Sequence, residues 1–155
     1  MKRVLLIPLV LFVGLAFGQS NKAEKSTKHN ISIGIFDDRT GLSLVGYTYN
    51  VRQTDMDEFF IGGGTMLLAY TGTVGWKHYY KKSKLSISSV VCGQYVEHLG
   101  GRGVMPTISL TLEYNLTKWT QLKLGAWGLT LLGGTSGESG GHSGVLPFIG
   151  LNFRF

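Results

Sequence analysis

Cysteine, proline and charged residues are all scarce in this chain. Its 155 residues include one cysteine, Cys92, and three prolines, and 15% of the residues are charged. A single cysteine excludes an internal disulfide, so the chain lacks the disulfide framework that stabilises many small exported domains. The few prolines exclude a proline-rich linker. No dense Lys/Arg run provides the basic stripe of a nucleic-acid binder, so no nucleic-acid partner is expected.

The N-terminus has the three-part pattern of a secretory signal peptide. Lys2 and Arg3 precede an apolar run over residues 4–17, and the small residues Ala16 and Gly18 flank a plausible cleavage site. A membrane anchor is the alternative, but the run has 14 residues (17 − 4 + 1), and a spanning helix needs roughly 20. We therefore predict a cleaved signal peptide over residues 1–18, a flexible segment over 19–29 and one domain over 30–155.

Beyond this segment the chain alternates between apolar and polar residues with a period of two, which predicts β-strands. The sixth candidate is the cleanest, with Ile108, Leu110 and Leu112 on one face and Ser109 and Thr111 on the other. Most candidates approach or exceed the roughly 9 to 11 residues that a tilted strand needs to cross a membrane. Eight strands are predicted, over residues 30–37, 41–51, 57–68, 71–81, 84–96, 103–115, 118–130 and 144–155.

The connections between these strands differ in length at the two ends of the predicted sheet. The two longest, EHLGGRG and GGTSGESGGHSG, are both odd-numbered, whereas the even-numbered KKSK and NLTK are tight turns. An outer-membrane barrel has this asymmetry, with longer loops outside and short turns in the periplasm. The extracellular face is accordingly predicted at residues 37–40, 69–71, 97–103 and 133–144.

Aromatic residues near the strand ends also favour a membrane, because amphipathic rings suit the headgroup level. At the even-turn end these are Tyr49, Tyr79, Tyr80, Tyr114 and Trp119. A secreted sandwich with its apolar face buried would explain the alternation equally well and is the competing fold. An open sheet cannot span hydrocarbon, so in the membrane interpretation the last strand pairs with the strand that begins near Asn30.

The final residues, GVLPFIGLNFRF, form a regular alternating strand with Phe153 and Phe155 on its apolar face. With the predicted signal peptide and even strand number, the chain resembles the small eight-stranded outer-membrane proteins of Gram-negative bacteria. The resemblance implies an all-β, antiparallel, up-and-down barrel of porin-like fold in the outer membrane of the cell envelope. It also implies contact with lipopolysaccharide, and recognition of Phe155 and Phe153 by the barrel-assembly machinery as an assembly signal.

If the apolar faces contact lipid, polar residues fill an interior that is just wide enough for side chains in an eight-stranded barrel. Glu113 and Lys123 become diagonal neighbours there if Leu112 pairs with Leu122, and Arg154 can join them. We interpret these three charges as a structural polar network, with an ion or proton pathway as the alternative. The expected interior residues are Ser86, Ser88, Gln94, Thr107, Ser109, Thr111, Glu113, Gln121, Lys123, Asn152 and Arg154.

Four residues in the odd connections are weak catalytic candidates: Glu97, His98, His142 and Ser143. Serine, histidine and a carboxylate can supply a nucleophile, a base and its orienting group. Lipid A deacylases and palmitoyltransferases are outer-membrane barrels of this kind, but the chain has neither a His-x-Ser-Asn stretch nor a long amphipathic N-terminal helix. A non-enzymatic structural or surface-interaction role with an unidentified extracellular ligand is therefore favoured, and lipid A modification is the alternative.

No cofactor is expected from the sequence, and no metal site either. His78 lies near a predicted periplasmic end and His29 lies in the N-terminal segment. Neither has a partner at metal-ligand spacing in the sequence.

Deleting Phe155 is expected to impair membrane insertion more than it impairs the stability of barrels that are already inserted. The reason is that the terminal aromatic residue is predicted to act during assembly. The fraction of heat-modifiable, folded protein in membranes measures insertion. If assembly proceeds normally without Phe155, the residue is part of a strand and nothing more.

Overall fold

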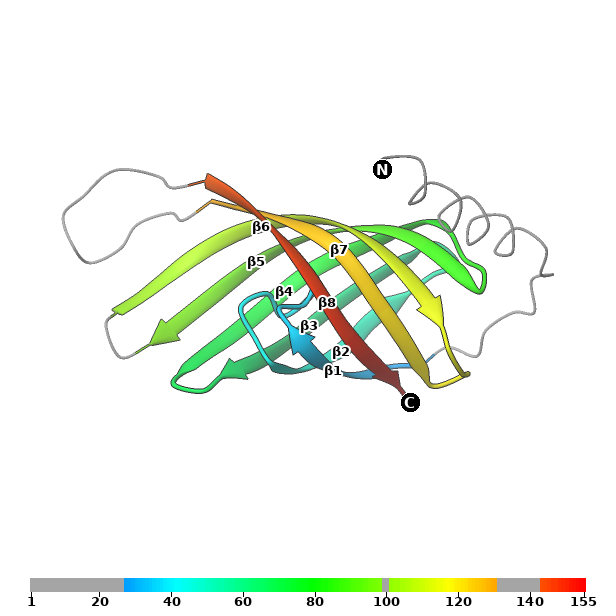
Figure 1. Cartoon of the computed structure of the whole chain (residues 1–155), viewed down its shortest axis with the longest axis horizontal. Coiled ribbons are helices and arrows are strands. Elements are labelled where there is room, and N and C mark those ends of the chain that lie inside the picture. The colour runs from blue at the N-terminus through cyan, green and yellow to red at the C-terminus, as the bar shows by residue number, and fades with distance from the viewer. Residues whose placement is uncertain (1–26, 99–100, 131–142) are drawn as a thin grey trace, which may run out of the picture.

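The computed structural model describes residues 27–98, 101–130 and 143–155. Eight strands pair antiparallel in chain order and β1 pairs with β8, which closes the sheet into a barrel (Figure 1). The predicted eight-stranded antiparallel barrel is confirmed. The predicted signal peptide lies outside the described residues. The strands are β1 (His29–Ile35), β2 (Val45–Gln53), β3 (Asp57–Met66), β4 (Ala69–Lys81), β5 (Leu85–His98), β6 (Gly101–Asn115), β7 (Thr120–Thr130) and β8 (Ser143–Arg154).

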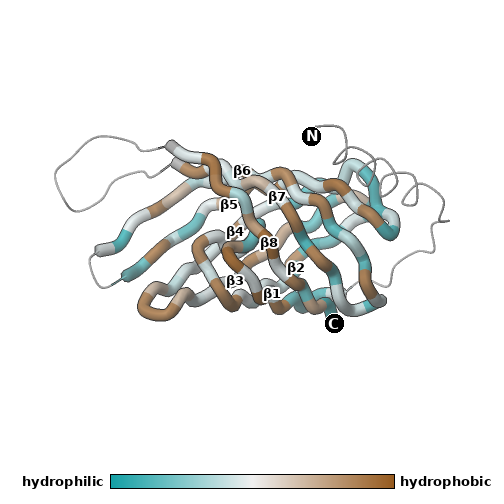
Figure 2. Tube along the Cα trace, in the orientation of Figure 1, coloured by the Kyte–Doolittle hydropathy of each residue, from teal (hydrophilic) through white to brown (hydrophobic). Residues whose placement is uncertain are grey.

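The barrel buries polar side chains and exposes apolar ones. Along β6, Ile108 and Leu110 are 60% and 57% exposed, whereas Ser109 between them is 4% exposed. Figure 2 shows hydrophobic and hydrophilic residues alternating along the strands. A sandwich would bury the apolar face, so this polarity contradicts the competing fold. All eleven polar side chains expected in the interior are buried.

Among the residues that the structure describes, no helix is both long enough and apolar enough to cross a membrane.

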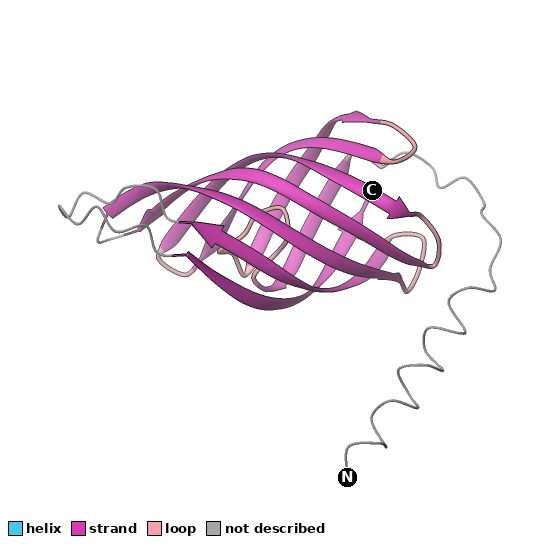
Figure 3. Cartoon of the chain, turned by 90° about the horizontal axis from the view of Figure 1, so that it is seen from above, coloured by secondary structure: helices cyan, strands magenta, loops and turns pink. Residues whose placement is uncertain are grey.

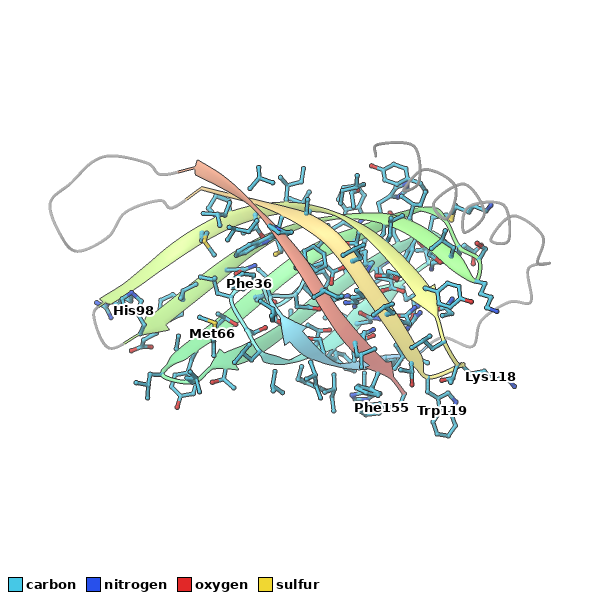
Figure 4. All side chains as sticks on the ribbon, in the orientation of Figure 1. Phe36, Met66, His98, Lys118, Trp119 and Phe155 are labelled. Atoms are coloured by element: carbon cyan, nitrogen blue, oxygen red, sulfur yellow. The ribbon has the colours of Figure 1, made fainter. Side chains whose placement is uncertain are left out.

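The C-terminal strand closes the barrel along the full length of β1. The register runs from Asn30 opposite Arg154 to Ile35 opposite Ile149. Beyond it, the amides of His29 and Phe155 each donate to the carbonyl of the other residue at 3.0 Å. Their rings stack with centroids 5.8 Å apart. Figure 4 shows Phe155 at the same end as Trp119 and opposite the end that carries His98.

β8 extends beyond the end of β1, and a proline lies where the pairing stops. The amide of Phe155 points toward β1, whereas the amide of Arg154 donates to Trp119 on the other side. Along a strand, the backbone N–H and C=O groups of successive residues point alternately to the two neighbouring strands. The odd-numbered residues of β8 therefore point these groups toward β1. Pro147 is the next odd residue after Ile149, where the pairing with β1 ends. Proline has no N–H, so it leaves no unpaired donor at this edge.

The connection between β1 and β2 folds into the barrel, which contradicts the prediction that residues 37–40 lie on the extracellular face. We call residues 36–44 the inner loop; Figure 3 shows loop segments within the outline of the barrel. Asp37, Asp38, Arg39 and Thr40 are at most 5% exposed. Two positive φ angles, 63° at Phe36 and 62° at Gly41, accompany the bend. The charged residues turn inward because the interior offers ion-pair partners.

The remaining odd connections are shorter than predicted, or lie outside the described residues. Residues 69–71, which were predicted to be extracellular, belong to β4, and residues 67–68 alone join β3 to β4. Residue 97 belongs to β5, and residues 101–103 belong to β6. They were assigned to connections because glycine, threonine and tyrosine occur in both strands and loops, and their extracellular location stays a prediction. Residues 131–142, which contain most of the fourth predicted loop, are not described.

Glycines that face the interior make room for the inner loop. A Cβ atom on Gly46 would lie 2.3 Å from the Thr40 hydroxyl oxygen, and one on Gly64 would lie 2.5 Å from the Ser43 Cβ. Both distances are too short for real Cβ contacts. Any larger side chain at Gly46 or Gly64 would therefore displace the inner loop.

Replacing Gly46 by alanine is expected to lower the free energy of unfolding by about 1 to 3 kcal/mol, the usual cost of overpacking. Gly72→Ala is the matched control, because a Cβ there meets no atom within 4 Å. The control is expected to change stability by less than about 1 kcal/mol. Urea titration of the folded barrel in detergent micelles measures both. Equal effects at the two positions would show that Thr40 does not lie against Gly46.

Candidate functional site in the barrel lumen

Among the described residues, the interior of the barrel, the lumen, contains equal numbers of buried acidic and basic side chains. The buried charged residues are four acids and four bases, so 4 − 4 leaves no net charge among them when all are ionised. Burying an unpaired charge costs several kcal/mol, so such a set is tolerated only when the charges are paired. The acids are Asp37, Asp38, Glu58 and Glu113, and the bases are Arg39, Lys77, Lys123 and Arg154.

Asp38, from the inner loop, connects two lysines that project from different strands, Lys77 from β4 and Lys123 from β7. Its carboxylate lies 2.8 Å from Lys77 Nζ and 2.6 Å from Lys123 Nζ. Lys77 also forms an ion pair with Glu113, and Lys123 forms one with Asp37 at 3.1 Å. Residues from β4, β6 and β7 are thereby joined to the inner loop by one connected set of charges.

Asp38 lies in the inner loop, and its pKa is held well below the usual range of an aspartate. Burial alone would raise this pKa, but the positive charges of Lys123 and Lys77 outweigh the cost of burial. Asp38 is therefore ionised at neutral pH and attracts both lysines.

A second cluster centres on Glu58, toward the even-turn end of the lumen. Arg39 forms an ion pair with this carboxylate and also donates to the Asn50 side chain at 2.8 Å. Arg154 approaches Glu58 at 3.4 Å, and the Gln53 amide donates to it at 3.0 Å. Because Asp38 and Arg39 are adjacent, the inner loop is fixed in both clusters at once.

The three charges expected to form one luminal network belong to different parts of these clusters. Glu113 and Lys123 lie directly opposite each other, and Leu112 pairs with Leu124 and not with Leu122. The condition set on the register is therefore not met, although the two charges still share a face because the shift is even. Glu113 pairs with Lys77, Lys123 with the two aspartates, and Arg154 with Glu58.

Toward the opposite end the lumen is apolar. Met105, Trp127 and Phe148 are buried together, and Phe36 and Leu42 of the inner loop pack against them. The rings of Phe36 and Trp127 stack with centroids 6.0 Å apart. The inner loop therefore contributes ion pairs at one end of the lumen and apolar contacts at the other.

Tyr79 also lies in the lumen, which contradicts its predicted place at the membrane interface. It is 2% exposed and its hydroxyl donates to Glu58 at 3.4 Å. Neighbouring residues of a strand point to opposite faces, so Tyr79 and Tyr80 cannot both face lipid. Tyr80 is the outward one, at 59% exposure.

The weak catalytic candidates are not brought together in the described part of the chain. Glu97 and His98 are exposed at the end of β5, and Ser143 begins β8, opposite Thr130. The registers of β5, β6 and β7 place Thr130 level with Gly93 on β5, five residues from His98. That offset is about 17 Å along the strand, so the backbones of residues 98 and 143 lie far apart. His142 lies outside the described residues.

A closed eight-stranded barrel with an apolar outer face and a polar interior has the arrangement of small transmembrane β-barrels. No family model matches the chain, and no curated protein matches it. Among solved structures, it is similar to the N-terminal β-barrel domain of Pseudomonas aeruginosa OprF. The TM-score is 0.49 and the identity 15%, over 83% of this chain and 94% of that one. At this level of similarity, no residue role is transferred between the two proteins.

Replacing Asp38 by asparagine is expected to destabilise the barrel by about 3 to 5 kcal/mol, because the two buried lysines then lose the carboxylate with which both form an ion pair. The double variant Asp38→Asn/Lys77→Met removes one charge of each sign. Its loss should be smaller than the sum of the two single losses by about 0.5 to 3 kcal/mol. Unfolding in urea, followed for all four proteins, measures the coupling. Strictly additive losses would contradict the direct contact.

Proposed function

We propose that this protein is an outer-membrane barrel that is closed to solutes and serves as a structural, surface-interacting element of the cell envelope. The observation that supports this proposal most strongly is the arrangement of polarity. The exterior is apolar, and the interior is filled by a loop held by ion pairs.

A filled lumen favours a structural role over a transport role. Conduction requires a continuous polar path, but Phe36, Trp127 and Phe148 pack together in the lumen toward the loop end. At the other end, the Glu58 cluster joins β2, β3 and β8 to the inner loop. Both ends of the interior are therefore occupied by side chains that contact one another, which supports a closed barrel.

The proposed partners follow from the exterior. Outer-membrane lipid, including lipopolysaccharide, would cover the apolar belt, and the barrel-assembly machinery would read Phe155 and Phe153. Phe155 is 57% exposed beside His29, so its ring is accessible to such a partner. An extracellular ligand would meet the loop end of the barrel, where Glu97 and His98 are exposed.

Cell fractionation combined with single-channel recording tests this function. The protein is expected in the outer-membrane fraction, with heat-modifiable mobility in a detergent gel. In planar bilayers the wild-type barrel is expected to stay closed at all times. An Asp38→Asn/Arg39→Gln variant removes inner-loop charges from both clusters, and it is expected to show intermittent openings if it folds. Recovery from a soluble fraction, or steady wild-type conductance, would contradict the proposal.

A further inference from the structure

Three polar residues form a row across the outward face of the barrel, where the neighbouring residues are apolar. Asp57 on β3 lies directly opposite His78 on β4, and His78 lies directly opposite Ser89 on β5. All three have the outward parity of their strands and are half-buried. A carboxylate, an imidazole and a hydroxyl in this order are the components of a nucleophilic hydrolase site.

Hydrogen bonds fix the orientation of the histidine in this row. His78 Nδ1 lies 2.8 Å from Asp57 Oδ1, and the indole N–H of Trp76 donates to the same oxygen at 2.9 Å. An ionised carboxylate only accepts hydrogen bonds, so Nδ1 is the protonated nitrogen and Nε2 of neutral His78 carries a lone pair. The rings of Trp76 and Tyr80 flank the imidazole, with centroids 5.8 and 5.2 Å away.

The serine is arranged as a donor. Tyr80 donates its hydroxyl proton to Ser89 Oγ at 3.1 Å, which leaves the hydroxyl proton of Ser89 available for another acceptor. Residues directly opposite on neighbouring strands have Cβ atoms about 4.5 to 5.5 Å apart. His78 lies directly opposite Ser89, which makes its Nε2 a candidate acceptor for this proton.

The row lies near the even-turn end of the barrel. Asp57 directly follows the turn at residues 54–56, and its backbone is hydrogen-bonded to Thr54. Trp76 and Tyr80, on either side of His78, are 40% and 59% exposed, and such amphipathic rings mark the boundary between headgroups and hydrocarbon. The ester carbonyls of membrane phospholipids lie at this depth.

We propose that Asp57, His78 and Ser89 form a lipid-facing serine-hydrolase site whose substrate is the acyl ester of a membrane phospholipid. This inference rests on the proposed membrane location. It differs from the lipid A modification considered for the loops, because the site lies at the opposite end of the barrel.

The chemistry is ester hydrolysis through an acyl-enzyme. Ser89 Oγ bonds to the ester carbonyl carbon while its proton passes to His78 Nε2, and Tyr80 can donate to the oxyanion. The bond from carbon to the glycerol oxygen then breaks, and this oxygen leaves with the proton from His78. A water molecule next adds its oxygen to the acyl carbon and gives a proton to His78 Nε2. The bond from the acyl carbon to Ser89 Oγ then breaks, and His78 returns the proton to this oxygen. The products are a lysophospholipid and a fatty acid.

Covalent labelling of the full folded barrel in detergent micelles tests the site without depending on its cellular location. A fluorophosphonate probe is expected to label Ser89, which peptide mass spectrometry identifies. Mixed micelles containing phosphatidylethanolamine should release fatty acid. This rate should fall by about 10³-fold or more in Ser89→Ala and in His78→Gln. Asp57→Asn should reduce it as well, because the histidine loses its orienting acceptor.

His29→Ala is the matched control, since it removes an outward-facing histidine near the same end of the barrel on β1. Its rate should equal that of the wild type. Heat-modifiable mobility shows whether each variant folds, and only folded variants are compared. If the folded wild-type barrel is not labelled at Ser89 and releases no fatty acid, the row is a structural interface cluster. Release that survives in Ser89→Ala would also overturn the proposal. Labelling at Ser89 in a protein that fractionates as soluble would overturn the membrane location alone.

Discussion

The double ion pair of Asp38 with Lys77 and Lys123 is the interaction on which the rest of the interior depends. Each lysine comes from a different strand, and neither can remain charged in a dry lumen without a carboxylate. The inner loop supplies that carboxylate, and the adjacent Arg39 neutralises Glu58. Among the described residues, the wall contributes three buried bases and two buried acids, whereas the loop contributes two acids and one base, so the loop supplies the negative charge that the wall lacks.

This internal polarity and the apolar exterior both follow from strand alternation. If one face of each strand contacts lipid, every alternate residue must be accommodated within a narrow barrel. Glycines such as Gly46 and Gly64 leave space for the inner loop. Pro147 has no backbone N–H, so no hydrogen-bond donor is left unpaired where β8 extends beyond the end of β1. Polar residues on the outward face depart from this alternation. Asp57, His78 and Ser89 are three such residues.

Period-two alternation was enough to predict the barrel, its strand number and the inward-facing polar residues of β5 to β8, because burial in a sheet depends on parity. It could not predict the inner loop, since Asp37, Asp38 and Arg39 have the composition of an ordinary surface turn. Their inward fold depends on Lys77, Glu58 and Lys123, which are distant in sequence. The row of Asp57, His78 and Ser89 could not be predicted for a similar reason, because these residues become neighbours only through the pairing of β3, β4 and β5. One signal was present, because all three interrupt the apolar parity of their strands.

The accessibility of Cys92 to a water-soluble maleimide tests the central claim most directly. This single cysteine faces the lumen, is 4% exposed and lies 3.9 Å from the carbonyl oxygen of Arg39 in the inner loop. If the loop fills the lumen, the thiol in the folded barrel remains unlabelled and reacts only after unfolding. Labelling of the folded barrel at the rate of the unfolded chain would show that the lumen is open to water, and would contradict the account.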